Sequence, residues 1–483
     1  MIDKVKIRMY RIGTGDFFLL QFKKSDIVSF NLMIDCGCIN AAKSDFSAKV
    51  EDLSTETNGV IDLLIVTHEH ADHINGFEKA SEIFNKKISF KKVWFAWTES
   101  NETYANTFRK EHAKVKIALQ KATILLNERL EDGSFQKMYA TEHNGLQMND
   151  SIRHFVSSLT GLSELNPEDE QLSLDSIPTM EDILRKHKVI KGDTIVEFKD
   201  PGDVVEDLEN LEGIRFFILG PPIDNKSIKI KEVKGEGYEK REKPSTLEMA
   251  FLNIFNQADI ESDDLLPFSD EYILNENHDI KEHYQNSDNY WRTIDNEWLM
   301  SAGSLALRHE TSINNTSLAM AIQFINSERI LLFPGDAEHG NWLSWHNKLE
   351  WSFRDLNNKI KKVNAEYILN NTVFYKVGHH LSQNGTPKEK GLELMKSDDF
   401  SAMVTLDFDK INAGWLNTMP NDLIGSELIR KTQGKLFFVG DRKQILKNIA
   451  TERVIVNKTH LQRLEKLNKP FDGKFYIDHE ITG

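Results

Sequence analysis

The chain has 483 residues, of which 40% are apolar, and a formal net charge of −15 at pH 7. This length exceeds the size at which one core keeps growing, so we expect two domains or one domain with a large insertion. The acidic balance argues against a broad surface for duplex nucleic acid, because Lys and Arg neutralise phosphates in such complexes.

Several features predict a cytoplasmic protein that makes no use of a membrane. Residues 5–9 already alternate between apolar and basic side chains, which excludes a signal peptide. The apolar stretch 214–223 is broken by Gly and Pro residues and is too short to span a membrane. Cys36 and Cys38 are too close for an unstrained disulfide, so we expect two inert residues at a strand end in a reducing compartment.

The hydrophobic pattern predicts strands and helices that alternate at both ends of the chain. Apolar runs bounded by turn residues predict strands, and apolar residues at helical spacing predict helices. Strands are expected at residues 5–12, 17–22, 30–35, 61–66, 93–97, 194–198, 214–219, 317–325, 329–333, 372–377, 402–406 and 435–439. Helices are expected at residues 74–84, 103–130, 151–159, 180–187, 341–351, 353–363 and 421–432.

This order predicts one α/β sandwich that is interrupted by helical insertions. The expected segments are a first half of the fold at 1–100, an insertion at 101–192, strands with a charged loop at 193–245, a second insertion at 246–300 and a second half at 301–483. The insertions could dock a protein partner.

The stretch from Thr67 to Gly76 contains three histidines and two carboxylates within six residues, directly after a predicted strand. His68 and His70 are two apart, so both side chains project to one side of an extended segment. Asp72 and His73 lie where the chain turns into a helix and can face a second ion. Imidazole with carboxylate suits zinc, iron or manganese better than calcium or magnesium.

This His-x-His-x-Asp-His sequence resembles the metallo-β-lactamase superfamily, and most closely the hydrolase domain of the DNA-uptake protein ComEC. The resemblance extends to motifs far apart in the chain. They are the Gly-x-Gly-Asp of residues 13–16, the Asn-Asn-x-Ser-Leu of residues 314–318, the Gly-Asp-Ala-Glu of residues 335–338 and the Lys-Val-x-His-His of residues 376–380. It implies an αββα sandwich with two divalent ions, zinc or manganese.

The resemblance also implies roles for individual residues. His68 and His70 bind the first ion, Asp72 and His73 bind the second, and Asp336 bridges both. Either His379 or His380 completes the second site; we expect His379 as the ligand and His380 as a proton donor, because neighbours at a strand end point in different directions. Asp35 would orient a histidine or the nucleophilic water. The expected catalytic residues are therefore Asp72, His380 and Asp35, and the expected ligands are His68, His70, Asp72, His73, Asp336 and His379.

Two departures from the superfamily's pattern concern the metal site. Many members supply another histidine to the first ion from a mid-chain turn, where this chain has Gly220, Pro221 and Pro222. Leu381 also stands where the ComEC group has glycine. The candidates for the absent histidine are His143, His154, His309 and His339.

The function expected from these features is a dinuclear metal-dependent hydrolase, a phosphodiesterase or nuclease that uses a metal-bridging hydroxide on nucleic acid or a nucleotide. One alternative is hydrolysis of a lactam, lactone or thioester. Another is a binding or regulatory module with little activity. Trp291, Trp298, Trp342, Trp345 and Trp351 could stack on bases, but large aromatics more often build a core.

Overall fold

A computed structural model describes residues 1–38, 41–113, 178–238, 312–407, 419–440, 457–468 and 475–483. Contacts divide the chain into two compact units, and the described residues lie almost entirely in the unit formed by 1–109, 178–241 and 311–483. The expected insertion at 246–300 and residues 114–177 of the other insertion lie outside the described residues. The domain boundaries therefore stay predictions.

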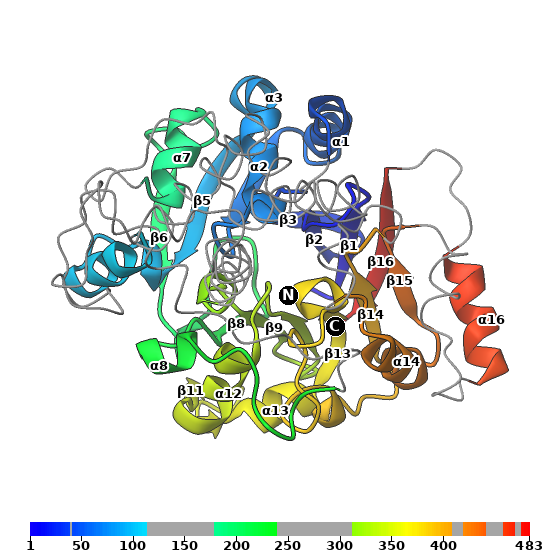
Figure 1. Cartoon of the computed structure of the whole chain (residues 1–483). Helices are drawn as coiled ribbons and strands as arrows, with labels where there is room; N and C mark the ends of the chain where they lie inside the picture. Colours follow the sequence, from blue (N-terminus) through cyan, green and yellow to red (C-terminus); the bar gives the residue numbers. More distant parts are fainter. Residues whose placement is uncertain (39–40, 114–177, 239–311, 408–418, 441–456, 469–474) are drawn as a thin grey trace, which may run out of the picture. The chain divides into compact units, whose positions relative to one another are not determined.

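The first sheet has seven strands in the order β16-β1-β2-β3-β4-β5-β6 (Figure 1). Strands from β16 to β3 pair antiparallel, whereas β3, β4, β5 and β6 pair parallel. Parallel strands direct their carboxyl ends to one edge of a sheet, which is where β4 delivers the histidine-rich stretch. The strands are β1 (Lys4–Tyr10), β2 (Phe18–Lys24), β3 (Ile27–Ile34), β4 (Val60–Ile65), β5 (Ser89–Ala96), β6 (Ile195–Lys199) and β16 (Tyr476–Thr482).

The second sheet also has seven strands, in the order β15-β14-β13-β10-β9-β8-β7. Pairing is parallel from β10 to β15 and antiparallel from β10 to β7. These two mixed sheets, together with their helices, confirm the predicted α/β class. The strands are β7 (Val204–Val205), β8 (Ile214–Ile218), β9 (Met320–Phe324), β10 (Ile330–Phe333), β13 (Thr372–Lys376), β14 (Ser401–Val404) and β15 (Leu436–Phe438).

One hydrophobic core contains side chains from both sheets. Phe18 meets Phe333 edge to face with ring centroids 5.8 Å apart, and Trp94 meets Phe216 at 5.1 Å. Each fully buried aromatic ring contributes about 1.5–3 kcal/mol relative to exposure, so such pairs hold the two sheets together. Trp342, Trp345 and Trp351 are buried as well, which agrees with a structural role for these tryptophans.

A second core lies on the other face of the first sheet, between its strands and helices α1 (Lys43–Glu56), α2 (Ala71–Lys79), α3 (Ser81–Lys87) and α7 (Met180–Lys186). It contains Cys36 and Cys38, both buried. Further elements are η1 (Trp97–Glu99), α8 (Asn225–Ile228), α12 (His339–Lys348), α13 (Ala365–Asn370), η5 (Gly378–Leu381), η6 (Leu392–Leu394), α14 (Asp422–Lys431) and α16 (Lys458–Leu467).

The predicted helix at 353–363 is wrong. The segment belongs to an antiparallel hairpin of β11 (Trp351–Arg354) and β12 (Ile360–Val363). Trp351 and Phe353 are buried while Ser352 and Arg354 are exposed, which is the two-residue period of a strand.

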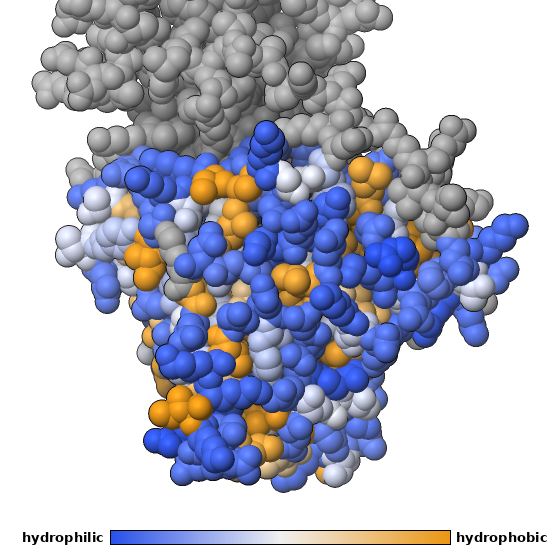
Figure 2. All heavy atoms as spheres, turned by 90° about the horizontal axis from the view of Figure 1, so that it is seen from below, coloured by the Kyte–Doolittle hydropathy of each residue, from blue (hydrophilic) through white to orange (hydrophobic). Residues whose placement is uncertain are grey.

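In the part of the chain that the structure describes, no helix is both long and apolar enough to cross a membrane. On the face shown in Figure 2, hydrophilic side chains predominate and apolar ones gather in small, separate patches. Scattered apolar residues of this kind are normal on a protein surface.

Candidate metal centre

The histidine-rich stretch connects the end of β4 to the start of α2. Its chain is extended at His70, which precedes the first residue of α2, and the helix then carries Asp72 and His73 in its first turn. Asp72 and His73 therefore lie close to the N-terminus of α2, where the helix dipole favours a carboxylate. His68, His70, Asp72 and His73 are all at least nine-tenths buried.

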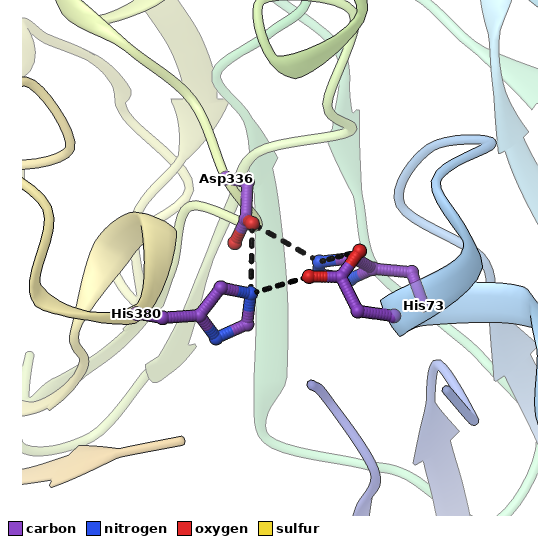
Figure 3. A group of neighbouring side chains, drawn as sticks. His73, Asp336 and His380 are labelled. Atoms are coloured by element: carbon purple, nitrogen blue, oxygen red, sulfur yellow. Dashed lines mark ion pairs between the residues drawn. The ribbon is translucent and has the colours of Figure 1, made fainter. Parts of the chain in front are cut away.

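Four side chains from three separate segments converge into one group: Asp72, His73, Asp336 and His380. Oδ2 of Asp336 lies 3.1 Å from Nε2 of His73 and 3.0 Å from Nε2 of His380. Nε2 of His380 also lies 3.0 Å from Oδ2 of Asp72. Figure 3 shows His73 and His380 pointing toward Asp336 from opposite sides. The structure thus brings residues 72–73 together with residues 336 and 380, and the roles of these residues as metal ligands stay predictions.

Asp336 is presented by a tight turn after β10. Gly335 has φ of +60°, which favours glycine, and a Cβ atom there would also crowd the side chain of Ser317 at 3.0 Å. The backbone N–H of Asp336 donates to Oγ of Ser317 at 3.1 Å.

The two neighbouring histidines after β13 are separated by an unusual backbone. His379, His380 and Leu381 have φ of +45°, +46° and +69°, three consecutive left-handed residues with side chains. Such conformations cost free energy, and several of them in succession are typical of functional sites. The turn places His380 in the four-residue group, whereas His379, expected as the ligand, lies outside that group.

His379 instead faces a buried polar pair. Its Nδ1 lies 3.5 Å from Oε1 of Glu338, and its Nε2 lies 3.3 Å from Nδ2 of Asn314. Asn314 in turn donates to Oε1 of Glu338 at 2.9 Å. Burial lowers the pKa of His379 to about 4, so this imidazole is neutral at pH 7.

In both histidines of the group, Nδ1 faces a hydrogen-bond acceptor. Nδ1 of His73 lies 2.7 Å from Oδ2 of Asp35, and Nδ1 of His380 lies 3.0 Å from the carbonyl oxygen of Thr405. Because these partners accept, each Nδ1 carries a proton, which leaves Nε2 as the atom that each ring directs to Asp336. Asp35 therefore lies behind a histidine, in the position expected from the sequence.

The electrostatics of the group favour a cation at its centre. Burial acts to raise the pKa of Asp72, but the positive charges of His73 and His380 outweigh it and hold that pKa at about 2. Burial acts to lower the pKa of His380, but Asp336 and Asp72 raise it to about 9. Without a metal ion the carboxylates thus retain protons on the imidazoles.

The donor set fits a metal ion. Nε2 of His73 and of His380 lie within 3.1 Å of carboxylate oxygens, yet neither makes a hydrogen bond. Buried imidazole nitrogens that converge on carboxylate oxygens without hydrogen-bond geometry are what a bound cation would satisfy, in place of the protons. Two imidazole nitrogens with carboxylate oxygens suit zinc or manganese.

His68 and His70 lie beside this group without belonging to it. Nε2 of His68 is 3.0 Å from Nδ1 of His70, and the rings of His68 and His73 have centroids 4.1 Å apart. Nδ1 of His68 lies 3.3 Å from Oγ of Ser317. His339 packs elsewhere, with its Nδ1 accepting from the N–H of Val233. The other candidates for the absent ligand, His143, His154 and His309, lie outside the described residues.

Three buried residues that support the four-residue group were not predicted from the sequence: Asp16, Lys376 and Thr405. Nζ of Lys376 lies 2.6 Å from Oδ2 of Asp16 and 3.0 Å from Oδ1 of Asp336. Oγ1 of Thr405 donates to Oδ1 of Asp16 at 2.7 Å. The motifs Gly-Thr-Gly-Asp and Lys-Val-Gly-His-His contain Asp16 and Lys376, so their position in those motifs was an available signal.

Three phage proteins resemble part of the chain, whereas no family model matches it. Anti-Pycsar protein Apyc1 of Bacillus phage BSP38 is 27% identical over 199 residues, or 37% of this chain and 71% of that protein. The Apyc1 proteins of Bacillus phages vB_BsuM-Goe3 and vB_BveM-Goe7 are 36% and 34% identical over 94 residues. These two matches cover 18% of this chain and 32% of each relative.

Proposed function

We propose that this protein is a metal-dependent phosphodiesterase with the metallo-β-lactamase αββα fold, closest in its motifs to the ComEC hydrolase domain. The observation that carries the proposal is the convergence of Asp72, His73, Asp336 and His380, with the imidazole protons held on the far side of each ring. The similarity to the Apyc1 proteins supports a phosphodiesterase-like hydrolase. It also favours cyclic nucleotides over polymeric nucleic acid as the substrate.

The roles in this proposal differ from those expected from sequence at two residues, His379 and His380. His380 binds the ion together with Asp72, His73 and Asp336, and His379 forms part of the adjoining wall with Glu338 and Asn314. As expected from the sequence, His68 and His70 are assigned to another ion beside this one. The layers expected for this fold agree with two sheets that share a core and with helices on the outer face of the first sheet.

Divalent ions bound by these residues would supply Lewis-acid chemistry, which lowers the pKa of water and stabilises charge on phosphate oxygens. The chain's own contribution is to fix the ligands before substrate arrives. Asp35 holds the proton on Nδ1 of His73, and the carbonyl oxygen of Thr405 holds the proton on Nδ1 of His380. Such preorganisation avoids rearrangement during the reaction.

Net hydrolysis adds one water to the phosphorus and breaks one phosphorus–oxygen ester bond. A cyclic nucleotide would give a nucleoside monophosphate, and the freed sugar hydroxyl would gain a proton. Because His379 is neutral at pH 7, we do not assign it as the acid that protonates the leaving oxygen.

The test is a substrate panel with protein reconstituted separately with zinc and with manganese. The panel contains 3′,5′-cyclic nucleotides with purine and pyrimidine bases, single-stranded DNA, single-stranded RNA and a chromogenic lactam, with products separated by chromatography. We expect turnover of a cyclic nucleotide that is lost in His380→Ala and kept in Asp62→Asn, which alters a carboxylate on β4 that binds Asn31 and Lys91. Turnover of the lactam alone, or equal turnover in His380→Ala, would refute the proposal.

A further inference from the structure

A lysine lies inside the metal centre. Lys376, the last residue of β13, is 1% exposed, and its ammonium contacts Oδ2 of Asp16 at 2.6 Å, Oδ1 of Asp336 at 3.0 Å and the carbonyl oxygen of Gly335 at 3.0 Å. An ammonium has three N–H donors, so these three acceptors complete it. Burial acts to lower the pKa of Lys376, but Asp16 and Asp336 raise it, so the group is charged.

The lysine adjoins a second cluster that has the composition of a metal site: Asp16, Asp35 and His73. Its ligand atoms are already engaged by the protein. Oδ1 and Oδ2 of Asp35 accept from the N–H and the hydroxyl of Thr67, each at 2.7 Å, and Nδ1 of His73 donates to Asp35.

Asp16 is the residue of this cluster that could bind either an ion or the ammonium of Lys376. Its Oδ2 faces Nδ1 of His73 at 3.8 Å, but the same oxygen binds Lys376 at 2.6 Å. Its Oδ1 accepts from the hydroxyl of Thr405. The oxygen that would bind an ion is therefore taken by the ammonium.

We infer that Lys376 acts as a built-in cation that replaces a metal ion between Asp16 and Asp336, so that divalent ions bind only on the side where Asp336 directs Oδ2 to His73 and His380. The inference concerns the same centre as the proposed function and rests on it for the presence of ions on that side. It assigns the two oxygens of Asp336 to different cations: Oδ1 to the lysine and Oδ2 to the metal.

The consequence follows from the charges. Removing the ammonium leaves the carboxylates of Asp16 and Asp336 buried and facing each other across the space that it filled. Like charges in a buried site are strongly unfavourable, and a cation from solution relieves them. A small residue at position 376 should therefore create a new metal site, rather than only weaken the existing one.

The experiment counts ions per chain by native mass spectrometry in manganese and in zinc, with thermal unfolding in chelator and in metal as a second readout. Lys376→Ala should bind one more ion per chain than the wild type, and manganese should raise its Tm over the chelator value by more than in the wild type. Lys376→Ala with Asp16→Asn should lose the additional ion. Lys362→Ala, at an exposed lysine paired with Glu350, is the matched control and should bind as the wild type does.

Asp16→Asn alone keeps the test decisive if Lys376→Ala does not fold. Because Lys376 rather than an ion binds Asp16, this variant should retain the wild-type number of ions; a lost ion would overturn the inference. A wild-type ion count in folded Lys376→Ala would also overturn it. A wild type that binds no divalent ion would instead refute the metal centre of the proposed function, while gain of an ion in Lys376→Ala would still support the role of the lysine.

Discussion

Asp35→Asn should weaken metal binding while leaving the metal-free fold intact. Asp35 is fully buried, and its Oδ2 accepts from Nδ1 of His73 and from the hydroxyl of Thr67, each at 2.7 Å. An amide nitrogen in the place of Oδ2 would donate to Nδ1 of His73 and move the imidazole proton to Nε2, the atom that faces Asp336. In the flipped amide, the nitrogen would meet the N–H of Thr67 instead.

The magnitude follows from the role of a group behind a metal ligand. Loss of such a partner reduces metal affinity by about 10- to 100-fold, which corresponds to about 1.4–2.7 kcal/mol. At a fixed excess of metal, the stabilisation by the ion falls by the same amount. The metal-free protein gains an offsetting benefit, because burial raises the pKa of Asp35 and a neutral amide avoids the cost of a buried charge.

The assay titrates zinc or manganese against a chromogenic chelator and compares the Tm in chelator with the Tm in metal. Asp35→Asn should show a Kd increased by about 10- to 100-fold and a Tm in chelator close to that of the wild type. Asp62→Asn is the control, since Asp62 accepts from the N–H of Asn31 and pairs with Lys91 outside the centre. A wild-type Kd in Asp35→Asn, or an equal loss of Tm with and without metal, would refute this reasoning.

Three other predictions use the same centre and the sheet that supports it. His380→Ala should weaken metal binding by at least about 100-fold, because it removes a ligand rather than a residue that supports one. His379→Ala should change metal binding by less than about 10-fold. Equal effects of the two variants on the chelator titration would contradict the assignment of His380 as the ligand. In chelator the Tm should fall as pH rises from 6.5 to 9. The pKa of His380 is raised from 6.5 to about 9, so the stability that its proton contributes is present below pH 6.5 and is lost as pH rises through 9. Saturating metal should remove this dependence, and a Tm in chelator that does not change with pH would contradict the prediction. Arg8→Met should lower the free energy of unfolding in urea by about 2–3 kcal/mol, because Arg8 binds Asp478 at 2.8 and 2.9 Å. This value is below the usual cost of breaking a buried ion pair, since the carboxylates are partly exposed. An effect as small as that of the control Lys362→Met would contradict the prediction.

The sequence predicted the parts of the centre that depend on local spacing and on recognisable strand ends. His-x-His-x-Asp-His follows an apolar run, and the run folds as β4, so its placement at a sheet edge needed no tertiary information. Asp336 follows the apolar strand β10 in the same way. Asp35 was expected behind a ligand and lies against His73.

The choice between His379 and His380 could not be made from sequence, because it depends on backbone dihedral angles. Three consecutive residues with side chains adopt the left-handed conformation, which no local preference favours. The position of β16 was equally hidden, since its pairing with β1 joins residues more than 460 apart in the chain. The hairpin at 351–363 was missed because short apolar segments fit both periods.

The four residues of the group come from both sheets, so contacts on both sides of the centre maintain the strained turn. Asp72 and His73 follow β4 of the first sheet, whereas Asp336 and His380 follow β10 and β13 of the second. Lys376 ties the same two sheets, because Asp16 precedes β2 and Asp336 follows β10. An ion bound here would join the sheets as the lysine does, so metal affinity includes part of the free energy of packing one sheet on the other. The left-handed turn at His379–Leu381 persists because the surrounding contacts determine it, among them the N–H of Asn421 donating to the carbonyl of Leu381 at 2.9 Å.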